Sequence, residues 1–149
     1  MRLRAILLAS FVSLVAQAAA GQDVTDRGRD ALDWINDFRA EEGRAPLNVS
    51  STLTRVAAAH AKDMARKDYF SHTGSDGSSV ADRARRVGYG FCFIAENIAE
   101  GQQGLDAVLT GWADSPGHRK NMLAPEAESV ALVEAPGRIW VMVLGRDGC

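Results

Sequence analysis

Trp112-Ala113-Asp114-Ser115-Pro116-Gly117-His118-Arg119-Lys120-Asn121-Met122-Leu123 is the most informative stretch of the 149-residue chain. Pro116 disfavours helical backbone at Ser115, so a helix that arrives at Trp112 must end there. Ser115 can cap a second helix that has Pro116 as its first residue. His118 then lies in the first turn, where the helix dipole keeps the imidazole neutral and available as a base or a metal ligand. A histidine without chemistry is the alternative on these residues alone.

Elsewhere in the chain, apolar residues recur at helical spacing in four segments. We predict helices from Asp26 to Glu42, from Ser50 or Ser51 to about Lys67, from Ser79 to Val87, and through Leu105, Val108, Leu109 and Trp112. Glycine follows the first and third of these segments, as is typical of helix ends.

The other apolar segments favour strands. Ser129 to Glu134 and Ile139 to Leu144 are rich in β-branched residues, and they flank a connection too long for the tightest hairpin turn. Phe91 to Ala99 fits either a strand or irregular coil. Helices followed by a hairpin predict an α+β fold, with helices packed on an antiparallel sheet in a single domain.

Residues 1–20 have the order of a secretory signal peptide, with a basic start, an apolar run and then small residues. We expect cleavage after Ala18 or Ala20 and a mature domain from 21 to 149 that is secreted or periplasmic. No later stretch is apolar enough to span a bilayer, which needs about 20 apolar residues. Cys92 and Cys149 are the only cysteines, so an oxidising compartment favours a disulfide between them.

The composition limits the function classes. A chain of 16.0 kDa is enough for one ordinary domain. A net charge of −2 gives no electrostatic footprint for nucleic acid. Two cysteines exclude a four-cysteine metal site. We therefore do not expect nucleic-acid binding. We expect a monomer, although the composition does not decide the oligomeric state.

Besides His118, two polar side chains stand out as candidates for chemistry. His72 lies in a polar loop after the second helix, where a histidine taken alone is more often a solvated loop residue. Glu96 shares a face with Ile94 and Ile98 if its segment is extended, and a carboxylate on an apolar face needs a partner. An imidazole, a metal ion or backbone amides would serve. His60 lies on the inner stripe of the second helix, so we interpret it as a core histidine.

The arginines carry a weaker signal. Arg39, Arg83, Arg85 and Arg86 have no phosphate-binding glycine loop beside them. We expect them to bind carboxylates or to cover the surface. The third predicted helix has Val80, Arg83, Ala84 and Val87 in helical register.

The order of the motifs resembles the bacterial branch of the CAP superfamily, also called SCP-like, which includes cysteine-rich secretory proteins, antigen 5 and pathogenesis-related class 1 proteins. The resemblance runs from about residue 31 to 145. Its most specific blocks are Ala95-Glu96-Asn97-Ile98-Ala99 and Ser115-Pro116-Gly117-His118-Arg119. It implies an α–β–α sandwich.

The resemblance also implies a cleft lined by two histidines and two glutamates, which holds a divalent metal such as zinc in some members. By position, His72, Glu96 and His118 correspond to three of these four residues and are the candidate metal or catalytic set. Ser115 stands where the second glutamate is usual, which removes one carboxylate. Two imidazoles and a carboxylate can still hold zinc at about 2.0–2.2 Å with an open fourth position.

Three functions are compatible with this set of residues. The cleft could bind a small apolar, lipid-like or envelope-derived ligand. It could instead support metal- or His/Glu-assisted hydrolysis of peptide or cell-envelope substrates. A third alternative is a structural or interaction domain with a vestigial cleft. Since Ser115 weakens the case for metal chemistry, we favour binding or interaction over catalysis.

Overall fold

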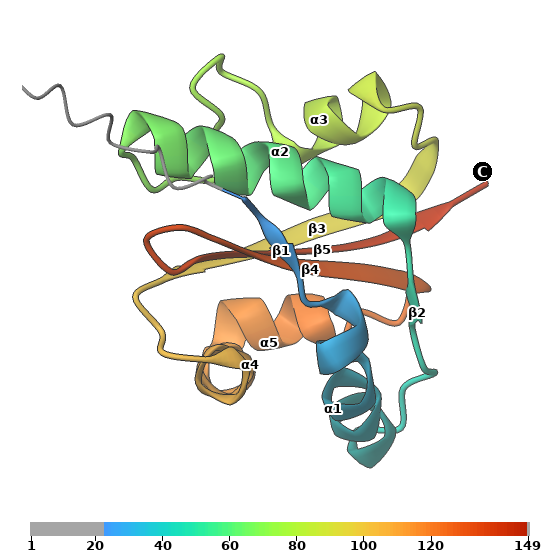
Figure 1. Ribbon diagram of the computed structural model, residues 1–149. Coiled ribbons are helices and arrows are strands. Elements are labelled where there is room, and N and C mark those ends of the chain that lie inside the picture. The colour runs from blue at the N-terminus through green and yellow to red at the C-terminus, as the bar shows by residue number, and fades with distance from the viewer. Residues whose placement is uncertain (1–22, 149) are drawn as a thin grey trace, which may run out of the picture.

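A five-stranded sheet forms the middle layer of the computed structural model, which describes residues 23–148 (Figure 1). The order of the main strands is β1-β4-β5-β3, and β2 pairs in parallel with β4. The other pairings are antiparallel. The strands are β1 (Thr25–Asp26), β2 (Asn48–Val49), β3 (Phe91–Glu100), β4 (Ser129–Ala135) and β5 (Ile139–Asp147).

Helices cover both faces of the sheet, so the predicted α+β class and the α–β–α sandwich are confirmed (Figure 1). On one face lie α2 (Ser51–Lys67) and α3 (Val80–Arg86). On the other lie α1 (Gly28–Glu41), α4 (Leu105–Asp114) and α5 (Pro116–Met122). Among residues 23–148, no helix combines the length and the apolar character needed to cross a membrane.

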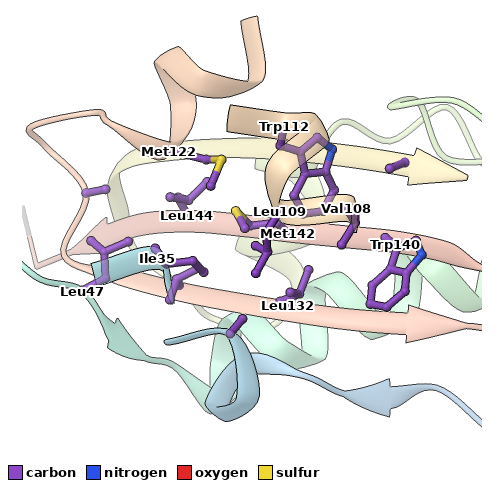
Figure 2. Packing of buried hydrophobic residues seen from close by; sticks show 14 of the residues in the cluster. Ile35, Leu47, Val108, Leu109, Trp112, Met122, Leu132, Trp140, Met142 and Leu144 are labelled. Carbon is purple, nitrogen blue, oxygen red and sulfur yellow. The ribbon is translucent and has the colours of Figure 1, made fainter. Parts of the chain in front are cut away.

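The alternation of side chains along β4 and β5 builds two separate cores. Leu132 and Met142 point to the layer of α1, α4 and α5, whereas Val133 and Val141 point to the layer of α2 and α3. Figure 2 shows the first core, in which Trp112 of α4 packs near the sheet. Since successive residues of a strand face opposite ways, both faces must be apolar when both are covered.

The structure corrects several boundaries. The first helix begins at Gly28 rather than Asp26, because Asp26 belongs to β1, pairs with Val133 and accepts a hydrogen bond from the Gly28 amide at 2.8 Å. Residues 91–100 form a strand. The hairpin connection is three residues long, and Gly137 and Arg138 adopt positive φ there.

A serine occupies the N-cap position of α2, α3 and α5. Ser50 caps α2 by accepting from the Leu53 amide at 3.3 Å, and Ser79 forms a capping box with Asp82 at the start of α3. Ser115 occupies the N-cap position of α5, but its side chain makes no capping hydrogen bond. Pro116 is the first helical residue, so His118 lies in the first turn as expected.

The predicted signal peptide and its cleavage site lie outside the described residues. Cys149 also lies outside them, so the Cys92–Cys149 bridge stays a prediction.

Candidate functional site

Glu96 is the centre of the polar cluster on the α2 and α3 side of the sheet. It lies on β3 opposite Val143, and only 2% of its side chain is exposed. Since β3 is extended here, the carboxylate projects from the same face as Ile94 and Ile98. A buried carboxylate is stable only with partners, and Glu96 has two of them.

Arg83 is the cationic partner of Glu96. Its Nη2 donates to Glu96 Oε2 at 2.8 Å and to the His72 carbonyl at 3.1 Å, while Nη1 donates to the Ser78 carbonyl at 2.7 Å. Only 7% of the Arg83 side chain is exposed. This one guanidinium therefore neutralises Glu96 and holds the loop that carries His72 against α3.

His72 is the second partner. Its Nδ1 lies 2.9 Å from Glu96 Oε1, and 58% of its side chain is exposed. A carboxylate can only accept, so Nδ1 carries a proton in this contact, and a neutral tautomer with this bond has Nε2 unprotonated. The predicted convergence of His72 and Glu96 is therefore present in the structure. The arrangement orients an imidazole in the way a general base requires.

His60 lies beneath this pair. It is 1% exposed, as expected for a core histidine. Its Nε2 donates to the Ser71 carbonyl at 2.8 Å and lies 3.9 Å from Glu96 Oε1. Burial lowers its pKa from the ordinary value of 6.5, and the nearby Glu96 charge only partly opposes this.

His118 lies beside a separate groove. The Asn97 side chain donates to its carbonyl at 3.1 Å, and its ring centroid is 6.3 Å from that of Trp112. The groove has a volume of about 400 Å³, and His118 and Trp112 line it together with Phe70 and Ser115. Phe70 is 44% exposed and is the one exposed large apolar side chain among the described residues.

His72 and His118 are close enough to interact electrostatically. Burial lowers the pKa of His118, and the neighbouring His72 lowers it further. Of the three predicted residues, only His118 lines the groove. Only His72 and Glu96 share a hydrogen bond among the interactions described.

This arrangement does not favour a metal ion. Both Glu96 oxygens are already engaged, one by Arg83 and one by His72. Within residues 23–148 no group of three or more His, Cys, Asp or Glu side chains could hold a metal. Ser115 adds no carboxylate. The donor set of His72, Glu96 and His118 does not fit zinc as it stands, and zinc binding remains a prediction of the resemblance.

We expect the protein to lose stability as the pH falls below 6.5. Both His60 and His118 have pKa values below that ordinary value in the folded state. The unfolded chain therefore binds protons first, and the free energy of unfolding declines from pH 6.5 down to the folded pKa values. Urea unfolding at pH 7.5, 6.5 and 5.5 measures this slope, since the lowered Asp pKa values act only below 3.8.

His118→Gln should make the slope shallower, because it removes one of the two histidines. Equal stability of the wild type at pH 7.5 and 5.5 would contradict the expectation.

The sequence matches the cysteine-rich secretory protein (CAP) family over residues 32–139. It is 33% identical to YkwD of Bacillus subtilis over 124 residues. The aligned region covers 82% of this chain and 48% of YkwD. It is 34% identical to YlbC, a membrane protein of B. subtilis, over 99 residues. This aligned region covers 66% of this chain and 29% of YlbC. This chain thus spans less than half the length of these two curated relatives.

Solved structures have the same fold. An extracellular protein with an SCP domain from Bacillus anthracis superposes with a TM-score of 0.75 at 29% identity, over 80% of this chain and 40% of that one. An outer surface protein of Borrelia burgdorferi gives a TM-score of 0.74 at 20% identity, over 85% of this chain and 99% of that one.

Proposed function

Because the chain belongs to the CAP family, we propose that it is an exported bacterial domain whose groove beside His118 binds a small apolar or envelope-derived ligand. The observation that carries this proposal is the groove of about 400 Å³. Ligand sites commonly have about 300–1,000 Å³, with mostly apolar walls and a few polar groups. The groove combines apolar Phe70 and Trp112 with polar Ser115 and His118.

Export is supported by the leader-like composition of residues 1–20 and by the extracellular relative from B. anthracis. Release to the medium and retention in the periplasm are both compatible with such a leader. A monomer remains our expectation.

The groove offers both polar and apolar wall. His118 and Ser115 contribute polar groups, while Phe70 and Val108 contribute apolar wall. An amphipathic molecule would place its hydroxyl or carbonyl group near His118 and its apolar part against Trp112. The exposed face of Phe70 would be covered in the complex.

Gly111→Phe should abolish ligand binding in the groove. Gly111 lies on the exposed side of α4 and lines the groove, and a Cβ added there meets no atom within 4 Å. The aromatic ring can therefore enter the groove without strain in α4. We expect the affinity for a fluorescent apolar probe, 1-N-phenylnaphthylamine, to fall at least about tenfold. Mass spectrometry of an organic extract of the purified protein should identify a ligand in the wild type only.

Gly111→Ala is the matched control. It leaves the groove open and should stabilise α4 by about 0.5–1 kcal/mol, because glycine is a poor helix former. Equal probe binding by the phenylalanine and alanine variants, with no ligand in the wild-type extract, would reject the binding function and favour a structural or interaction role.

Hydrolysis is the second candidate, and the His72–Glu96 pair favours it. Glu96 holds the ring at 2.9 Å, so the exposed imidazole could accept a proton from a water molecule. The substrate would be a peptide or an envelope polymer bound next to the exposed His72 ring. Incubation of the same purified protein with peptidoglycan fragments, followed by product analysis, distinguishes turnover from binding.

A further inference from the structure

A second pocket of about 340 Å³ lies between α2 and α3 under the loop from Gly74 to Ser78. His60 and Arg83 line it, whereas His72, Glu96 and His118 do not. Both lining residues are in contact with Glu96. The pocket is therefore separate from the groove beside His118, and it shares two side chains with the polar cluster.

The charges around this pocket are already balanced within the chain. Lys67 lies 3.3 Å from Asp63, and Arg86 pairs with Asp76. The guanidinium of Arg83 is neutralised by Glu96. A charged ligand would have to compete with one of these pairs, so the lining favours a neutral ligand.

Two buried polar atoms of the lining residues have no hydrogen-bond partner among the described residues. They are His60 Nδ1 and Arg83 Nε. Since His60 Nε2–H donates to the Ser71 carbonyl, Nδ1 of the neutral ring can only accept. Arg83 Nε–H can only donate. The ligand group that satisfies both atoms must offer one donor and one acceptor.

We infer that this pocket binds a neutral ligand that carries an acetamido group. The N–H of that group donates to His60 Nδ1, and its carbonyl accepts from Arg83 Nε–H. Its methyl group packs against apolar lining residues such as Val56 and Val87. A buried polar atom without a hydrogen-bond partner costs free energy, so a ligand that pairs both atoms is stabilised by removing that cost. Both atoms are buried, so the ligand reaches them only if part of the pocket wall moves. We expect the exposed residues 75–77 to make this movement.

The test is a titration of the ¹⁵N-labelled protein with N-acetylglucosamine, followed by amide chemical shifts. We expect saturable shifts in residues 59–63, 74–78 and 83–87. Glucosamine, which lacks the acetyl group, should give none. N-acetylalanine methylamide presents the same chemistry on a peptide, so its binding relative to the sugar distinguishes a peptide source from a glycan source.

Ala59→Leu blocks the pocket from an exposed position of α2 and should weaken N-acetylglucosamine binding at least about tenfold. Ala40→Leu makes the same change at an exposed position of α1 that does not line this pocket, and it should bind as the wild type does. Absence of saturable shifts with both acetamido probes, or equal binding by the two variants, would overturn the inference. Gly111→Phe should leave this binding intact, so failure here is distinct from failure of the groove.

Discussion

Replacing Arg83 with methionine should lower the free energy of unfolding by about 3–5 kcal/mol. The change leaves the Glu96 carboxylate buried without its cation, at 2% side-chain exposure. It also removes the hydrogen bonds to the His72 and Ser78 carbonyls, which hold the loop after α2. Removing one partner of a buried ion pair costs more than replacing both partners with apolar residues, because the remaining charge stays buried without a counter-charge. Urea unfolding at pH 7.5 measures the loss.

Arg85→Met is the control on the same helix. Arg85 is exposed, and its ion pair with Asp82 at 3.4 Å is a surface pair, so its loss should cost less than about 1 kcal/mol. In the double variant Arg83→Met and Glu96→Gln, removal of the negative charge should restore part of the stability. A loss in Arg83→Met no greater than that in Arg85→Met would contradict the role assigned to this guanidinium.

The helices and the hairpin could be predicted because each buries one face. A helix with one apolar stripe and a strand pair rich in β-branched residues are patterns that local sequence contains. Residues 91–99 were ambiguous for a physical reason, since β3 lies between two helical layers and its apolar residues do not alternate. The two-residue strands β1 and β2 are too short to have a periodicity at all.

The candidate site was predictable in part. A carboxylate expected on an apolar face proved to have an imidazole partner, as the segment around Glu96 suggested. Arg83 was not distinguished from Arg85 and Arg86, although only Arg83 falls in the apolar register of its helix. A cation on a buried stripe is the signal that could have identified it. Its pairing with Glu96 depends on how α3 packs against β3, which local sequence does not encode.

Arg39 is a second buried cation, and its partners are backbone carbonyls instead of a carboxylate. The expectation of a carboxylate partner or a surface position was wrong, because Arg39 is 0% exposed and its hydrogen bonds go to three carbonyls. Nε donates to Ala45 at 2.8 Å, and Nη1 donates to Met122 at 2.7 Å and to Ala124 at 3.2 Å. The guanidinium thus joins α1 to the segment that follows α5. Burial lowers its pKa, and the nearby Arg44 adds to this effect.

Arg39→Met should therefore destabilise the fold by about 2–4 kcal/mol, since three carbonyls lose a charged donor and the apolar replacement recovers only packing. Arg44→Met is the control, because it removes an exposed charge that disfavours the Arg39 cation, and its effect should stay within about 0.5 kcal/mol. Hydrogen exchange of residues 122–127 should accelerate in Arg39→Met alone. If these amides stay as protected as in the wild type, the carbonyl contacts do not hold this segment. Such a result would place the coupling between α1 and α5 in the apolar core around Ile35 and Met122 instead.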